Sequence, residues 1–454
     1  MVREGQSVGQ AAQFCLAARS GVSPSFDAAR NVIAVNETGP KCESFVEHLI
    51  GWDFLEARGA LLAAIALVIS TCASHAEKIY DPGASDTAIK IGNTMPYSGP
   101  NSAFAVIGRT QAAYFKMIND QGGINGRKID YISYDDSYSP PKTVEQVRRL
   151  VESDEVLLLY SILGTPTNLA AIKYINSKKV PHLLIASGGT VFGDYKQFPW
   201  SMGFQPHSQG ETSVYGRYLA ENYPNAKIGV LYSADGLGRD NITGFKKGLG
   251  DKVGNVVVEQ TYEVTDPTID SQMVKIRTTG VDVFANFTTP KFAAIAIRKA
   301  AEMGWKPVHI LHGISLSIEN VLKPAGIENA KDLVTSNYVK ELGDPSWDDD
   351  PGVNKFAAFI DKYLPGENKH NSNVAYAYMS AQTMVHILGQ CGDDLTRANV
   401  MRQAENLKDF ELDLLLPGIK VNTSPTDHYP IQQTRMHRFH GTRWQGFGPV
   451  LELD

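Results

Sequence analysis

From about residue 87 onward, the sequence alternates between short apolar runs and longer amphipathic stretches, and this alternation restricts the fold more than any other feature. The segment 89–136 shows the repeating unit: an apolar strand, a loop of small and polar residues, an amphipathic helix and an alternating strand at Lys128–Asp135. The pattern continues to about residue 185 and restarts at Lys227. Two long series of this kind predict an α/β fold with two lobes, each built on a doubly wound parallel sheet.

The composition is that of an ordinary globular protein. The 454 residues are 43% hydrophobic and 20% charged, and the formal net charge of -6 gives no reason to expect nucleic acid as a partner. The four cysteines form no Cys-x-x-Cys pair and no Cys/His ligand spacing, so we expect neither a metal site nor a disulfide framework. We expect no cofactor, and the length favours more than one domain.

An apolar segment near the N-terminus predicts export. Gly59–Ile69 is an unbroken run of apolar and small residues, shorter than the roughly 20 residues that a membrane-spanning helix needs. Arg58 precedes this run, and Ser74–Ala76 places small residues where signal peptidase cleaves. We therefore expect residues 1–76 to comprise an N-terminal extension and a cleaved signal peptide, with a periplasmic mature protein that begins near Glu77.

Two features of this N-terminal part leave alternatives open. The residues before the apolar run are acidic rather than basic, so we expect translation to start downstream of Met1. Ile69–Cys72 resembles a lipoprotein box, although Thr71 stands where Gly or Ala is usual. A lipid anchor at Cys72 is therefore an alternative to simple cleavage.

The sequence lacks the motifs of the common enzyme classes. It contains no G-x-G-x-x-G after a strand, no Walker A sequence, no G-x-S-x-G and no H-E-x-x-H. Gly236–Gly238 comes nearest to a dinucleotide-binding loop but lacks its third glycine. Asp135 and Asp136 are neighbours on a strand, so their side chains point to opposite faces and do not form a catalytic pair. We therefore expect a binding protein rather than an enzyme.

Loops rich in glycine and small hydroxyl residues follow several of the predicted strands. Gly164–Asn168 opens a helix after a buried strand, so its backbone N–H groups can face an anion. Ser187–Thr190 occupies the corresponding place one strand later, and Tyr97-Ser98 follows the first strand. Ligands bind outside the carboxyl ends of parallel strands, which is where these loops should meet. The candidate residues of this anion site are Tyr97, Ser98, Gly164, Thr165, Thr167, Ser187, Gly188, Gly189 and Thr190.

Three motifs extend this prediction: IKIGNTMPYSGPNSAF, the helix end NDQGGINGRKI and the strand end YDDSYSP. Because of them, the chain from Thr87 to Asp454 resembles the type I periplasmic solute-binding proteins of ABC importers, the Leu/Ile/Val-binding protein family. The resemblance implies two α/β lobes joined by a three-strand hinge, with the ligand held between them. It also implies a membrane permease as partner, and we expect the protein to be a monomer.

The resemblance and the breaks in the pattern together give the lobe boundaries. The three crossovers should lie near Phe204–His207, Thr335–Tyr338 and Leu416–Ile419. The first lobe would then comprise residues 87–205 and 338–416, and the second lobe residues 206–337 and 417–454. The tail of the chain reads as a β-hairpin that turns at His440-Gly441.

The resemblance also implies how the ligand is held. In the family, hydroxyl and backbone groups of the first lobe hold a carboxylate, and Thr165 and Ser187–Thr190 stand at those positions. The second lobe usually offers an aromatic side chain where this sequence has Leu237, and an acidic residue on the loop after Val308–Leu311. Here that loop contains His312 and Ser315 but no carboxylate. Both are candidate ligand contacts, although His312 has capping of the strand end as an alternative role.

The missing carboxylate bears on the ligand class, because a buried ammonium group without an anionic partner is costly. A small carboxylate ligand without an amine is therefore expected, and Tyr97, Phe104 and Phe192 favour an aromatic acid. The alternatives are a branched-chain or other amino acid, or an amide-type sensory receptor on the same fold.

Overall fold

The computed structural model describes residues 78–99, 101–341 and 343–453. These residues lie in one compact unit, Glu77–Asp454. The predicted signal segment and Cys72 lie outside the described residues. Within the described part, no helix is both long and apolar enough to cross a membrane.

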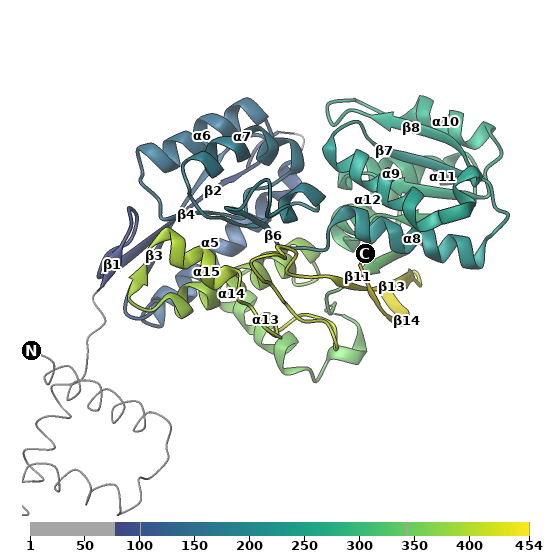
Figure 1. Cartoon of the computed structure of the whole chain (residues 1–454). Coiled ribbons are helices and arrows are strands. Elements are labelled where there is room, and N and C mark those ends of the chain that lie inside the picture. Colours follow the sequence, from purple (N-terminus) through teal and green to yellow (C-terminus); the bar gives the residue numbers. More distant parts are fainter. Residues whose placement is uncertain (1–77, 100, 342, 454) are drawn as a thin grey trace, which may run out of the picture. The chain divides into compact units, whose positions relative to one another are not determined.

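Five parallel strands form the sheet of the first lobe (Figure 1). In sheet order they are β3 (Lys128–Asp135), β2 (Ala88–Met95), β4 (Leu158–Tyr160), β5 (His182–Ile185) and β6 (Ser201–Gly203). The apolar run around β4, from Val156 to Ile162, is completely buried, as a central strand covered on both faces requires. Because the first strand in sequence lies inside the sheet, this lobe has the predicted doubly wound topology.

Helices cover both faces of this sheet. They are α5 (Ala105–Asp120), α6 (Pro140–Glu152), α7 (Thr165–Ser177), α13 (Pro351–Tyr363), α14 (Ser372–Cys391) and α15 (Arg397–Ala404). On one face of the sheet, α5 packs against α14 and α13. On the other face, α6 packs against α7. A separate parallel pair joins β1 (Ile79–Tyr80) to β12 (Asp394–Leu395). The first lobe therefore draws on two stretches of the chain that are far apart in sequence.

The second lobe contains a seven-stranded sheet, of which five strands are parallel. In sheet order the strands are β14 (Trp444–Glu452), β13 (Gln433–Phe439), β11 (Val334–Asn337), β10 (Val308–Leu311), β9 (Val283–Phe287), β7 (Ile228–Ser233) and β8 (Val256–Tyr262). Its helices are α8 (Ser208–Asn222), α9 (Gly236–Leu249), α10 (Asp270–Thr278), α11 (Pro290–Glu302) and the short α12 (Lys323–Ala325). The antiparallel pair β13–β14 confirms the hairpin predicted for the tail.

Three crossovers connect the sheets within the described residues. The first lies between β6 and α8, the second follows β11, and the third leads into β13. The structure places the third crossover later in the chain than the sequence analysis did. Ile419, Val421 and Ile431 lie in the hydrophobic core of the first lobe, so residues 417–431 pack there rather than with the second lobe.

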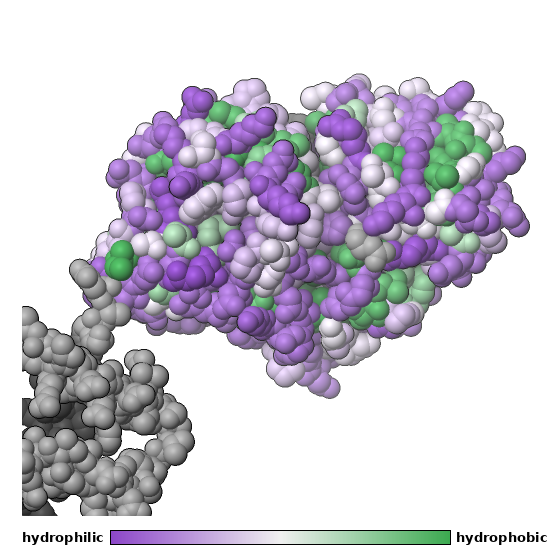
Figure 2. Space-filling model, viewed as in Figure 1, coloured by the Kyte–Doolittle hydropathy of each residue, from purple (hydrophilic) through white to green (hydrophobic). Residues whose placement is uncertain are grey.

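Most large apolar side chains are buried in these cores. Figure 2 shows a mainly hydrophilic face with smaller apolar patches over both lobes. Among the described residues, the exposed large hydrophobic side chains are Ile79, Leu169, Val253, Val257 and Val274. These side chains belong to several separate elements and therefore do not form a continuous apolar stripe along any one helix.

A buried guanidinium group attaches the start of the described chain to the first lobe. Arg127 is 2% exposed and its Nη2 forms an ion pair of 2.6 Å with Asp393. The same side chain donates to the Ser85 and Gly392 carbonyl oxygens and to the Tyr80 hydroxyl. These bonds connect β1, the loop before β2 and the segment before β12. A planar group with several fixed donors is suited to this role.

We predict that Arg127→Met destabilises the protein by about 2–3 kcal/mol, because the Asp393 carboxylate and two carbonyl oxygens lose a donor that is itself buried. Urea unfolding followed by circular dichroism measures this change. Lys116→Met is the matched control, because Lys116 and Asp120 form an exposed pair on α5 that should contribute less than about 0.5 kcal/mol. Equal unfolding midpoints for the two variants would contradict the anchoring role of Arg127.

Candidate ligand-binding site

A pocket opens between the two lobes at the carboxyl ends of their parallel strands. First-lobe loops after β3, β4 and β5 line it with Tyr138, Leu163–Thr165 and Ala186–Gly188. The second lobe contributes the loop after β10 and Leu237, at the start of α9. Open parallel sheets bind ligands at this edge, so the pocket is the candidate functional site.

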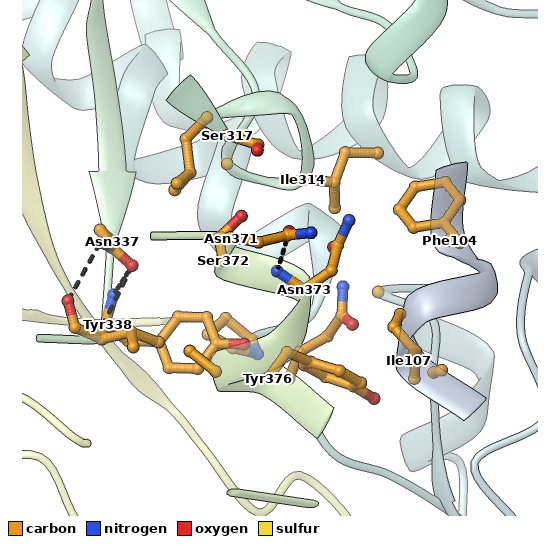
Figure 3. Close-up of a pocket in the computed structure, with 18 of the residues that line it drawn as sticks. Phe104, Ile107, Ile314, Ser317, Asn337, Tyr338, Asn371, Ser372, Asn373 and Tyr376 are labelled. Atoms are coloured by element: carbon orange, nitrogen blue, oxygen red, sulfur yellow. Dashed lines mark hydrogen bonds between the residues drawn. The ribbon is translucent and has the colours of Figure 1, made fainter. Parts of the chain in front are cut away.

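The crossovers and the first turn of α14 complete the pocket. In Figure 3, Tyr376 and the start of α14 lie on one side, and Ile314 and Ser317 from the second lobe lie on the other. Phe104 and Ile107 lie at one end of this view, and Asn337 and Tyr338 lie at the opposite end. The pocket therefore has apolar walls with polar groups at separate places, which suits an amphipathic small molecule.

Two of the predicted loops meet as expected. The hydroxyl oxygens of Thr165 and Ser187 lie 2.7 Å apart, and both residues line the pocket. Gly164, with φ of 98°, forms the N-cap of α7, and no side chain caps this helix. A Cβ atom on Gly164 would come within 2.4 Å of the Tyr138 ring, so only glycine fits. The positive end of α7 and two hydroxyl groups thus face the pocket together, an arrangement that attracts a carboxylate.

Of the predicted site residues, Gly164, Thr165, Ser187, Gly188 and Leu237 line the pocket. The other seven, which are Tyr97, Ser98, Thr167, Gly189, Thr190, His312 and Ser315, lie outside its lining. Most of these make hydrogen bonds within the protein. The Thr167 hydroxyl donates to the Gly164 carbonyl at 2.9 Å, and the Ser315 hydroxyl donates to the Thr288 carbonyl at 2.6 Å.

His312 is a buried structural residue. Its Nε2 lies 2.9 Å from the Asn241 side-chain oxygen, and its Nδ1 accepts a hydrogen bond from the Ile314 N–H. Burial lowers the pKa of His312. These contacts are those of a residue that caps the end of the strand, which was the alternative role predicted for His312.

Thr190, Tyr97 and Ser98 also have partners away from the pocket. The Thr190 N–H donates to Asp240 on α9 at 2.7 Å. Tyr97 pairs with the Ser133 hydroxyl at 2.6 Å, and Ser98 donates to Asp135 at 2.6 Å. Of the three aromatic walls predicted, only Phe104 lines the pocket, because Phe192 is 1% exposed within a small core of the first lobe.

A carboxylate does reach the loop after β10, and it comes from a distant part of the chain. Glu211, in the first turn of α8, lines the pocket and is 6% exposed. Its Oε1 accepts hydrogen bonds from the Tyr215 hydroxyl at 2.6 Å and the Gly313 N–H at 2.8 Å. The Ser336 hydroxyl donates to the same oxygen at 3.3 Å. The loop itself contains no carboxylate, as its sequence states, and Glu211 supplies one to it from α8.

A second acidic side chain, Glu341, lines the pocket after the second crossover. The Asn337 amide donates to its Oε1 over a long distance of 3.4 Å. Burial, with a smaller effect from Asp344, raises the pKa of Glu341 to about 8. The nearby ammonium group of Lys340 is paired with Asp350 at 2.8 Å.

Several pocket residues could not be recognised from strand and helix patterns. The start of α14 carries a usable signal, because Asn371 caps the helix through the Asn373 N–H. Glu211 carries a weaker signal, as an acidic residue in a helix that starts after a crossover. Glu341 carries none, because it lies outside regular elements.

Comparisons with known proteins agree with this architecture. The model of a family described as "Periplasmic binding protein" matches residues 88–442. A "Leu/Ile/Val-binding protein homolog 1" from Brucella abortus is 24% identical over 315 residues, which cover 69% of this chain and 81% of that protein. A "Leu/Ile/Val-binding protein homolog 7" from Brucella suis is 23% identical over 347 residues, covering 73% and 83%.

Solved structures share the fold at low sequence identity. A branched-chain amino acid ABC transporter protein from Thermus thermophilus with bound valine has a TM-score of 0.74 at 16% identity, covering 81% of this chain and 97% of that one. A fatty acid ABC transporter substrate-binding protein from Thermomonospora curvata has a TM-score of 0.69 at 21% identity, covering 83% and 95%. These likenesses confirm the predicted two-lobed fold, and because the family model spans most of the sequence, the chain belongs to the periplasmic binding protein family.

Proposed function

We propose that the protein is the substrate-binding component of an ABC importer, exported to the periplasm through a cleaved signal peptide. In this role it captures a small carboxylate ligand as a monomer and delivers it to a membrane permease. The observation that carries the proposal is the pocket between the lobes, where Thr165, Ser187 and the uncapped start of α7 face apolar walls. A binding role rather than catalysis accords with the family to which the chain belongs.

An amino acid is the ligand class that this pocket supports best. A carboxylate would bind at Thr165 and Ser187, and the apolar part of the ligand would contact Leu237 and Tyr376. The argument for an amine-free ligand depended on a missing carboxylate, and Glu211 and Glu341 remove that premise. The relatives named Leu/Ile/Val-binding protein homologs support the same class.

An aromatic acid is the second candidate. The walls formed by Phe104, Ile107, Leu237, Ile314 and Tyr376 provide apolar contact for a ring or an alkyl chain. A structural neighbour is described as a fatty acid ABC transporter substrate-binding protein, and a fatty acid is a carboxylate without an amine, which supports this candidate.

A thermal-shift panel separates the two classes. A ligand at 100 times its dissociation constant adds about 2.7 kcal/mol to the free energy of unfolding. We expect L-leucine, L-valine or L-phenylalanine to raise the unfolding temperature more than benzoate, cinnamate or 3-phenylpropanoate. Stabilisation by the acids alone would favour the second candidate. No stabilisation by any member of either set would contradict the proposal of a small carboxylate ligand.

The carboxylate position predicts the effect of removing one hydroxyl group. Thr165→Val keeps the shape of the side chain but removes its hydrogen bond, so binding of the stabilising ligand should weaken by about 1–3 kcal/mol. Thr167→Val is the matched control, because Thr167 is not part of the pocket lining and its hydroxyl donates to the Gly164 carbonyl rather than to a ligand. Isothermal titration calorimetry measures both affinities. Equal affinities for the two variants would place the carboxylate elsewhere.

We also propose that the lobes close around the ligand by movement at the crossovers. In this structure two hydrogen bonds link the lobes: the Thr190 N–H donates to the Asp240 carboxylate at 2.7 Å, and the Asn320 side-chain amide donates to the Asn371 side-chain oxygen at 3.3 Å. Small-angle scattering should show a smaller radius of gyration when the ligand from the panel is saturating. The variant Thr165→Val at the same ligand concentration should contract less. An unchanged radius at saturation would contradict closure.

A further inference from the structure

One carboxyl group in the pocket has no charged partner among the residues that the structure describes. Glu341 forms no ion pair with any described residue, and the hydrogen bond that it accepts is the long one from Asn337, 3.4 Å. Burial of a carboxylate is unfavourable unless an opposite charge or several donors compensate for the lost water. Glu341 is partly buried, so its carboxylate loses part of its hydration, and a positive charge on a molecule in the pocket would compensate for that loss.

Glu211 differs from Glu341 in this respect. One of its oxygens accepts from the Tyr215 hydroxyl, the Gly313 N–H and the Ser336 hydroxyl. These bonds satisfy that oxygen and fix the carboxylate between three segments of the second lobe. Glu211 thus has a structural task that Glu341 does not share.

The lysines beside the pocket have partners of their own. Lys340 pairs with Asp350 at 2.8 Å and also donates to the Asp413 carbonyl. Lys369 pairs with Asp361 at 2.7 Å. Neither ammonium group is available to neutralise Glu341 without breaking an existing pair.

We propose that Glu341 holds the ammonium group of the ligand and is a further specificity-determining residue of this site. This assignment rests on the proposed function, because it requires a ligand that carries both a carboxylate and an amine. It places the amine partner on the segment after the second crossover, whereas the family resemblance implies an acidic residue on the loop after β10.

The assignment implies that binding is coupled to proton release. Burial raises the pKa of Glu341 from its ordinary 4.5 to about 8, so the ligand-free side chain is mostly protonated at neutral pH. An ammonium group favours the ionised form, and the proton then leaves to the buffer. Affinity for an amino acid should therefore increase as the pH rises toward 8, by at most about tenfold per pH unit.

Other titratable groups near this wall must be separated from Glu341. They are Asp344 on the same segment, His370 and Tyr338 in or beside the pocket, and His437 on β13. Desolvation raises the pKa of the partly buried Tyr338 well above its usual value, and burial lowers the pKa of His437. His370→Gln is the variant that removes the imidazole group from the pocket lining.

The test uses two matched pairs of probes on the mature protein. L-Leucine is compared with 4-methylpentanoate, the same molecule without its amine, and L-phenylalanine is compared with 3-phenylpropanoate. Glu341→Gln should weaken binding of the better amino acid by about tenfold or more at pH 8. Its affinity for the matching amine-free acid should change by less than about twofold. Glu145→Gln, on the exposed face of α6, is the control and should change neither affinity.

The pH profile gives a second measurement. Between pH 6 and pH 8, the wild-type protein and His370→Gln should bind the amino acid about tenfold more tightly or better at the upper end. The profile of Glu341→Gln should be nearly flat. Two results would overturn the assignment and leave Glu341 a structural role. One is a pH dependence of affinity in Glu341→Gln as steep as that of the wild type, and the other is an equal loss of affinity for both members of a pair.

The pH dependence of the unfolding temperature, measured without ligand, tests the assignment independently of any probe. A carboxyl group whose pKa is raised by folding stabilises the folded state below its ordinary pKa and loses that contribution as the pH rises through about 8. The unfolding temperature of the wild type should therefore fall relative to Glu341→Gln between pH 5 and pH 8. Parallel curves would overturn the assignment. If only the amine-free acids bind, the importer role stands and the role of Glu341 is wrong, whereas binding of no probe contradicts both.

Discussion

The pocket depends on one buried carboxylate, that of Glu211. Its Oε1 accepts hydrogen bonds from α8, from the loop after β10 and from β11, through Tyr215, Gly313 and Ser336. A carboxylate with 6% exposure is stable in this position because these donors replace the water that it loses. Glu211 follows the first crossover and Ser336 precedes the second. The Glu211 carboxylate therefore holds the ends of two crossovers in a fixed position relative to the pocket loop after β10.

The parts of the fold that follow from local patterns were predictable from the sequence. The run Val156–Ile162 identified a strand buried on both faces because every residue in it except Ser161 is apolar. The meeting of Thr165 with Ser187 was predictable because both follow neighbouring parallel strands, whose carboxyl ends must share one edge. Capping and turn chemistry likewise indicated the hairpin at His440-Gly441.

The rest could not be predicted because it depends on contacts between distant segments. Glu211 and Gly313 are about one hundred positions apart in sequence, and no periodicity links them. The third crossover was placed too early because Ile419, Val421 and Ile431 lie outside regular helices and strands, yet pack into the first core. Thr190 resembled a ligand-binding residue but donates its N–H to Asp240, which only the packing of the two lobes brings near.

The origin of each pocket residue suggests where discrimination between ligands arises. Thr165, Ser187 and the start of α7 all belong to the first lobe, so in the proposed function this lobe alone would hold the carboxylate before any closure. Leu237 and Ile314 belong to the second lobe, so the apolar wall is complete only when the lobes are together. A ligand shifts such an equilibrium only by its additional affinity for the closed form. Under the proposed hinge movement, the carboxylate therefore determines which molecules are captured, and the remainder of the ligand determines which of them close the lobes.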